Sequence, residues 1–176
     1  MPRLKSSPDR YGTVAVWIHW LSAVLILLLL ITGFRAVDAP DALAKAALLR
    51  VHIPTAITVL LLTAFRILWW WRFDHKPAPL ASMPPWQAGL SRGVHVTLLV
   101  IVLGMVASGI GMMILSGAGP AVFGAPGAVM PDFHEVLPRR PHGLGARLMI
   151  ALLAVHAGAA LYHHFVRRDE TLKRMW

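Results

Sequence analysis

The sequence predicts an all-α integral membrane protein, organised as one four-helix bundle that takes up the whole chain, residues 1–176. Hydrophobic residues make up 57% of the chain and charged residues only 14%, which is too apolar for a water-soluble domain of this length. In addition, four apolar segments recur along the chain, each close to the roughly 20 residues that a helix needs to cross a bilayer. Connections rich in proline, glycine or charge separate them.

The four apolar segments run from about residue 11 to 34, 48 to 71, 93 to 115 and 141 to 166. The hydrocarbon core of a bilayer offers no water to the backbone, so each segment should satisfy its own hydrogen bonds as a helix. The predicted connections are residues 37–45, 72–87 and 116–140, of which the last is rich in glycine, alanine and proline.

The first segment also has features of a cleavable signal peptide, because Arg3, Lys5 and Arg10 precede it. Its apolar run, however, exceeds the roughly 7–15 residues of a signal peptide's hydrophobic region. It also contains His19 between two tryptophans. We therefore predict a retained transmembrane helix.

Basic residues set the expected orientation. The chain carries 17 lysines and arginines against 8 acidic residues. In so apolar a chain this excess predicts membrane flanks, not a nucleic-acid partner. With both termini on one side, only six basic residues fall on the other side, and they are Arg35, Lys45, Arg50, Arg139, Arg140 and Arg147. The positive-inside rule then predicts that both termini are cytoplasmic.

Cysteine is absent from the chain, whereas there are nine histidines. Without cysteine there can be no disulfide, iron–sulfur cluster, thiolate-bound haem or covalently attached c-type haem. The histidines are therefore the strong transition-metal ligands that the sequence offers.

Spacing within the fourth segment gives the sharpest indication of a cofactor. His142 and His156 are 14 residues apart, so they share one helix face about 21 Å apart along its axis. Their distances from flanking arginines match them in depth with histidines on other segments: His52 with His142 at the outer level, and His19 with His156 at the inner level. Ionisable side chains are costly inside a membrane and usually functional there.

Five histidines remain. His95 and His163 match each other at a shallower inner level, where a functional role and a simple interfacial hydrogen bond are both open. We expect His75, His134 and His164 to face solvent.

Histidine pairs at two depths, without nearby carboxylates or sulfur, favour six-coordinate haem iron over tetrahedral zinc or copper. The sequence thus predicts two b haems, one held by His52 and His142 and the other by His19 and His156. Gly33, which is 14 residues beyond His19, would let the outer porphyrin approach the backbone. Three other glycines could do the same or could simply allow close helix packing: Gly104, Gly109 and Gly158. A metal or solute transporter, which would show no haem absorbance, is the alternative.

The chain resembles the prokaryotic cytochrome b561 family, and within it the bacterial superoxide oxidase type, over nearly its whole length. The resemblance rests most on residues 142–147 (HGLGAR), 155–165 (VHAGAALYHHF) and 168–175 (RDETLKRM). It is supported by residues 18–21 (IHWL), 51–53 (VHI) and 89–95 (GLSRGVH).

This resemblance implies the same two haem pairs and a multi-pass protein of the bacterial inner membrane. It also implies that superoxide is oxidised at the periplasmic face and that ubiquinone accepts the electrons. Superoxide would be steered by Arg35, Arg50, Arg139 and Arg140, of which the last two could instead anchor lipid headgroups. His95 and His163 would bind the quinone or relay protons.

A different class of function is an electron-transfer subunit of a hydrogenase or formate dehydrogenase. The outer connection and both tails are short, so we expect contacts with lipid, ubiquinone and superoxide but no obligate protein partner.

Overall fold

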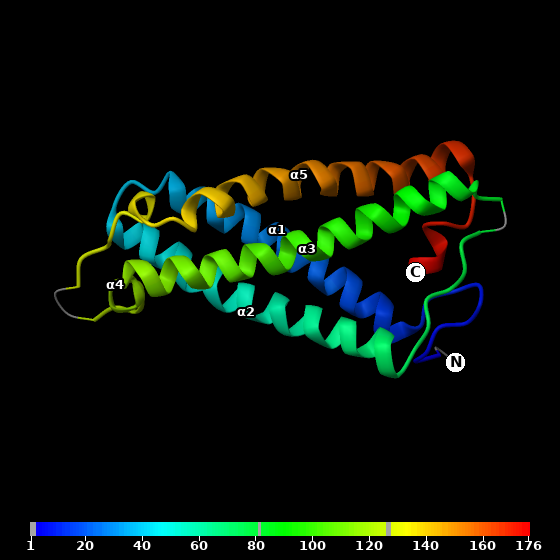
Figure 1. Cartoon of the computed structure of the whole chain (residues 1–176), viewed down its shortest axis with the longest axis horizontal. Coiled ribbons are helices and arrows are strands. Elements are labelled where there is room, and N and C mark those ends of the chain that lie inside the picture. The colour runs from blue at the N-terminus through cyan, green and yellow to red at the C-terminus, as the bar shows by residue number, and fades with distance from the viewer. Residues whose placement is uncertain (1–2, 81, 126–127) are drawn as a thin grey trace.

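The computed structural model describes residues 3–80, 82–125 and 128–176, and within these ranges all regular structure is helical, as predicted. The four long helices are α1 (Thr13–Val37), α2 (Ala42–Arg72), α3 (Pro85–Ser116) and α5 (Arg139–Tyr162). The short elements are α4 (Gly119–Phe123), the 3₁₀ helices η1 (Phe133–Glu135) and η3 (Lys173–Met175), and the π-helical η2 (His163–Arg167). The long helices lie side by side, with both termini at one end and α4 at the other (Figure 1). We call these the terminal end and the α4 end.

Two of the helices begin well before their apolar segments, α2 by six residues and α3 by eight. α2 begins at Ala42, where the Asp41 carboxylate accepts a 2.8 Å hydrogen bond from the Ala44 N–H and caps the helix. α3 begins at Pro85, a residue that favours the first helical position. Hydropathy finds the hydrocarbon-spanning part of a helix, whereas its polar ends extend further. The predicted connection 116–140 also proved to contain α4 and η1.

Three residues of the predicted connections, Ala81, Pro126 and Gly127, lie outside the described residues.

The bundle consists of two closely packed helix pairs, α1 with α2 and α3 with α5. A layer of apolar side chains, which we call the central layer, joins the pairs half-way along. Its buried members are Val59 of α2, Val102 of α3 and Met149 of α5, packed against leucines and isoleucines of α1 and α3 and Leu153 of α5. Met149 is seven residues from both His142 and His156, so the layer lies between the two predicted haem levels.

The surface of the bundle is strongly apolar. Exposed fractions reach 61% for Ile31, 64% for Leu61 and 72% for Ile114, all within long helices. Exposing this much apolar surface to water would be unfavourable, whereas contact with lipid tails is not. Each of the four long helices is long and apolar enough to cross a membrane.

Asp74 organises the terminal end. It is 4% exposed and follows α2. Its carboxylate accepts hydrogen bonds from the Ser6 N–H and hydroxyl, from the Trp69 ring N–H and from the His75 N–H, at 2.8–3.2 Å. Burial alone would raise the pKa of Asp74, but these hydrogen bonds stabilise the anion and lower the pKa below its usual value. Asp74 thus fastens the N-terminal segment to α2.

The C-terminal tail closes the same end. The Arg174 guanidinium donates to the carbonyls of Asp9 (2.9 Å), Pro8 (3.2 Å) and Ala78 (2.8 Å). The Trp20 ring N–H donates to the carbonyl of Met175 at 2.9 Å. The tail therefore ties together the N-terminal segment, the α2–α3 connection and α1.

We predict that Asp74→Ala destabilises the protein by about 1–3 kcal/mol, because partly buried donors of Ser6 and Trp69 lose their acceptor. Thermal unfolding in detergent would measure it. Since the pKa is lowered in the folded state, this stabilisation is present at neutral pH and is lost as the pH falls below about 4. Asp9→Ala, an exposed acid in the same segment, is the control; equal effects of the two substitutions would contradict the role of Asp74.

Candidate functional site

The pair predicted at the outer level meets at the α4 end. The rings of His52 on α2 and His142 on α5 have their centres 6.4 Å apart. The Thr32 hydroxyl on α1 lies 3.1 Å from Nδ1 of His52, and the Ser108 hydroxyl on α3 lies 2.9 Å from Nδ1 of His142. The sequence analysis did not identify these two hydroxyls, because serine and threonine within helices are common and carry no spacing signal.

Two glycines lie against the same rings. A Cβ atom at Gly33 would be 3.1 Å from Cε1 of His52, and one at Gly109 would be 3.4 Å from Cε1 of His142. These two glycines therefore lie beside histidine rings, whereas the sequence suggested an approach to a porphyrin. A Cβ at Gly104 or Gly158 would meet no atom within 4 Å.

The inner level brings together three histidines instead of two. The ring of His156 lies 6.0 Å from that of His19 and 5.2 Å from that of His95, measured between ring centres. The expectation that His95 shares a shallower level with His163 is thus wrong: α3 places it beside the predicted inner pair. Arg66 of α2 also reaches this level, where its guanidinium donates to the Ile18 carbonyl at 3.0 Å.

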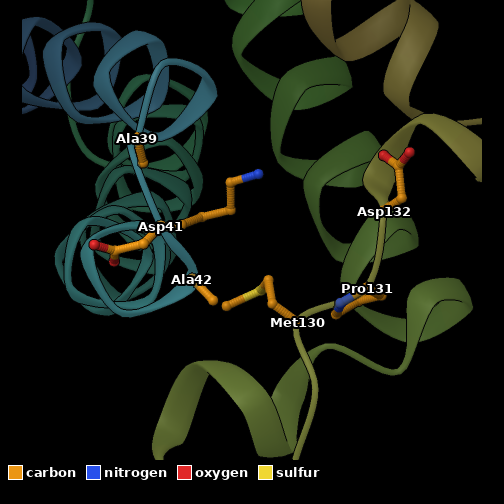
Figure 2. A pocket seen from close by; sticks show the side chains of 7 residues that line it. Ala39, Asp41, Ala42, Met130, Pro131 and Asp132 are labelled. Atoms are coloured by element: carbon orange, nitrogen blue, oxygen red, sulfur yellow. The ribbon is translucent and has the colours of Figure 1, made fainter.

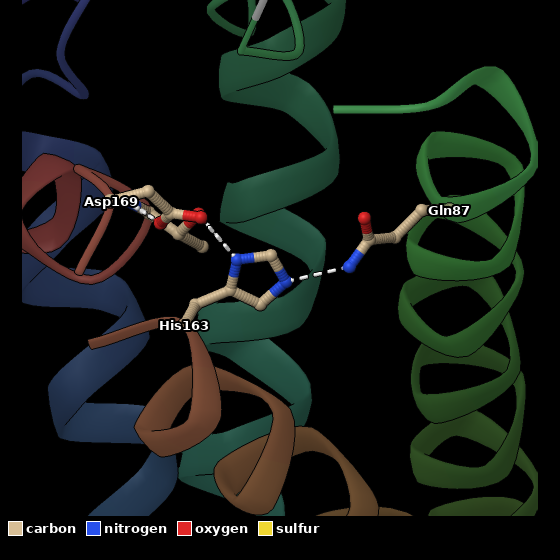
Figure 3. Close-up of polar contacts among 4 residues, drawn as sticks. Gln87, His163 and Asp169 are labelled. Atoms are coloured by element: carbon tan, nitrogen blue, oxygen red, sulfur yellow. Dashed lines mark hydrogen bonds and ion pairs between the residues drawn. The ribbon is translucent and has the colours of Figure 1, made fainter. Parts of the chain in front are cut away.

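His163 forms a separate polar cluster nearer the terminal end (Figure 3). Its side chain is buried. Nδ1 lies 2.5 Å from a carboxylate oxygen of Asp169, and Nε2 lies 2.8 Å from the Gln87 amide nitrogen. With Nε2 accepting from Gln87, the ring donates from Nδ1 to Asp169. Both ring nitrogens are engaged, so a further ligand at Nε2 would have to displace Gln87.

Local backbone geometry explains how Asp169 reaches His163. α5 widens into the π-helical η2, a form of helix often found at functional sites. Arg168 then adopts a left-handed conformation with φ of 52°. This conformation turns the chain back toward His163, where the Asp169 N–H donates to the His163 carbonyl. Burial alone would raise the pKa of Asp169, but hydrogen bonds from Thr171 and His163 lower it, so the carboxylate is ionised at neutral pH.

The predicted superoxide-steering arginines are spread over the α4 end. Arg35 and Arg140 are exposed and Arg139 is half-buried. Arg50 has a structural contact, since its Nε donates to the Val122 carbonyl at 2.5 Å and holds α4 against α2.

Two cavities open at the α4 end. One, of about 330 Å³, is lined by Ala39, Asp41, Ala42, Lys45, Met130, Pro131 and Asp132 (Figure 2). The other, of about 260 Å³, includes Arg50 in its lining. Neither is lined by a histidine, so neither forms a direct path to the His52–His142 pair.

The separations between the histidine rings can be compared with those that a haem held between two histidines requires. Imidazole nitrogens bind first-row metals at about 2 Å, so two rings on opposite sides of one metal have centres about 6 Å apart. The separations of 6.4 Å for His52–His142 and 6.0 Å for His19–His156 agree with this. Although three histidine rings lie near one another at the inner level, no group of three histidine, aspartate or glutamate side chains within the described ranges is arranged to hold a bare metal ion. At each level the residues fit a haem that would be held between two histidines.

The sequence can also be compared with those of known proteins. The sequence pattern of the family described as "Prokaryotic cytochrome b561" matches residues 10–176. The chain belongs to the prokaryotic cytochrome b561 family. Membership implies b haem and electron transport in a prokaryotic membrane.

Individual relatives of this cytochrome b561 chain align over nearly their whole length. It is 28% identical to "Cytochrome b561 homolog 2" of Escherichia coli (strain K12), covering 97% of this chain and 93% of that protein. It is also 28% identical to "Probable superoxide oxidase CybB" of Yersinia pestis, covering 94% and 95%. Identity to "Cytochrome b562" of Cereibacter sphaeroides is 31%, covering 94% of each.

We predict that His142→Ala lowers the haem content per protein by about half, because one of the two predicted haems would lose one of its histidine ligands. His52→Ala should have the same effect, measured from the absorbance of the reduced pigment. His134→Ala, at an exposed histidine of η1, is the control. Unchanged pigment in both variants would contradict haem ligation at the α4 end.

Proposed function

We propose that this cytochrome b561 is a di-haem oxidoreductase of the bacterial inner membrane that oxidises superoxide at the periplasmic face and reduces ubiquinone at the cytoplasmic face. The observation that carries the proposal is the pairing of histidines at two levels, separated by the central layer. One haem would be held by His52 and His142 at the periplasmic level, and the other by His19 and His156 at the cytoplasmic level. When bound, each haem would supply an iron that accepts and releases one electron.

Electron counting fits two such levels. Two superoxide anions yield two molecules of oxygen and two electrons, and one ubiquinone consumes two electrons and two protons to give the quinol. We place both termini in the cytoplasm, because only six of the 17 basic residues lie at the α4 end.

The periplasmic end would attract the anion by its charge. Arg35, Arg139 and Arg140 lie within a few residues of the α4-end boundaries of α1 and α5. Cationic surfaces that steer an anion raise encounter rates by roughly 10–10³-fold, and salt screens the effect. The name of the Yersinia pestis relative also supports superoxide as the electron donor.

The cytoplasmic end would supply protons. We assign His163 to proton relay and His95 to hydrogen bonding with the quinone. His163 is only 7% exposed, whereas its partner Asp169 retains 19% exposure of its side chain. Asp169 can therefore exchange protons with water. When His163 gives a proton from Nε2 to the quinone in place of its contact with Gln87, Asp169 gives a proton to Nδ1 along the 2.5 Å hydrogen bond and takes its replacement from water.

The proposal is tested by mixing purified haem-loaded protein rapidly with superoxide and ubiquinone. We expect quinol to form at one molecule per two superoxide anions, more slowly as ionic strength rises. Absorbance would follow the pigment and the quinone together. A protein that binds haem but forms no quinol under these conditions would overturn the superoxide assignment. Co-purification with an iron–sulfur subunit would favour an electron-transfer subunit instead.

We predict that Asp169→Asn slows quinol formation about tenfold or more, because the relay loses its proton-accepting carboxylate. Reduction of the pigment by superoxide without quinone should not change. Glu170→Gln, at the exposed neighbour, is the control. A variant that loses thermal stability but keeps its rate would show that Asp169 only fastens the C-terminal tail.

A further inference from the structure

We propose that Thr32 and Ser108 are positioning residues for the α4-end histidines. Each hydroxyl accepts a hydrogen bond from Nδ1–H of its histidine and so keeps Nε2 unprotonated and free to bind iron. The inference rests on haem ligation in the proposed function, and it concerns residues that family membership does not assign.

Counting hydrogens decides which group donates. The Thr32 hydroxyl lies 2.7 Å from the Leu28 carbonyl, and the Ser108 hydroxyl lies 3.0 Å from the Met105 carbonyl. A carbonyl can only accept, so each hydroxyl gives its single hydrogen to its own helix. What faces the histidine is then an oxygen lone pair.

Because that lone pair faces Nδ1 at 3.1 Å in His52 and 2.9 Å in His142, Nδ1 must carry the hydrogen. A neutral imidazole has one ring proton, so Nε2 keeps its lone pair. This is the tautomer in which Nε2 can be the metal ligand, with Nδ1–H held by a neighbouring acceptor.

The arrangement occurs twice, on different helices and in the same sequence order. In Thr32-Gly33 of α1 and Ser108-Gly109 of α3, a hydroxyl residue that contacts Nδ1 is followed by a glycine at which an added Cβ would meet Cε1 of the same ring. The glycine leaves room for the ring edge, since a Cβ would lie 3.1 or 3.4 Å from it. Each helix thus holds a histidine of its own packing partner: α1 holds that of α2, and α3 holds that of α5.

The inner level lacks this feature. Within the described residues, the rings of His19 and His156 have no hydroxyl as a hydrogen-bond partner. A hydrogen bond donated by Nδ1–H makes the ligand more basic, which favours the oxidised iron. The two hydroxyls therefore lower the reduction potential of the α4-end haem specifically.

The test uses the full-length haem-loaded protein with Thr32→Val, Ser108→Ala and the double substitution. Optical redox titration should show that the midpoint potential of the α4-end haem rises in each single variant and rises further in the double variant. The potential of the inner haem should stay the same. Thr58→Val is the matched control, because the Thr58 hydroxyl donates to the Pro54 carbonyl at 3.0 Å without touching an imidazole.

Conservative exchanges separate hydrogen bonding from packing. Thr32→Ser and Ser108→Thr keep the hydroxyl and should keep the potential near that of the unmodified protein. Potentials that do not move in the double variant, or that move as much in Thr32→Ser as in Thr32→Val, would overturn the proposal.

A second measurement does not depend on haem. Nitrogen-15 NMR of histidine-labelled, haem-free full-length protein should show His52 and His142 protonated at Nδ1, and this preference should weaken in Thr32→Val and Ser108→Ala. Protonation at Nε2 in the unmodified protein would overturn the proposal. Failure of the unmodified protein to bind haem would instead refute the proposed function.

Discussion

Imidazole side chains that meet inside an apolar bundle impose the main constraint on this protein. Their polar nitrogens need partners where water is absent, and each ring must come close to a ring from another helix. The 14-residue interval between His142 and His156 sets the height of both meeting points on α5. The other helices are placed to match these two heights. α2 brings His52 next to His142, and α1 brings His19 next to His156. The central layer fills the space between.

Sequence reasoning identified the features that follow from periodicity and composition. Long apolar runs predicted the four helices. Spacing on one helix face gave the two levels, and distances from flanking arginines predicted that His52 meets His142 and that His19 meets His156. The ends of α2 and α3 were not predicted, because Asp41 and Pro85 act through local capping and helix-start preference instead of hydropathy. α4 was also missed, since five residues carry too little pattern to distinguish a helix from a loop.

The candidate sites were predictable only where partners lie on regular helices. His95 was assigned to the wrong level because its depth was measured from Arg92, although α3 continues past that arginine to Pro85. Gln87 and Asp169 could not be connected with His163 from the sequence. Their contact depends on the π-helical turn and on the left-handed Arg168, and neither has a reliable sequence signal. Thr32 and Ser108 became recognisable only once their distances to the rings were known.

The composition of the central layer has an electrical consequence. Valine, leucine, isoleucine and methionine side chains carry neither protons nor small ions, so charge moving between the two levels would move as electrons. Each such transfer crosses part of the transmembrane voltage, which is worth about 2.3 kcal/mol per charge for 100 mV across the full membrane. Electrons travelling toward a negative cytoplasm work against that voltage and add to it. Under the proposed function, the apolar layer between the two histidine levels would make this cytochrome a generator of membrane potential.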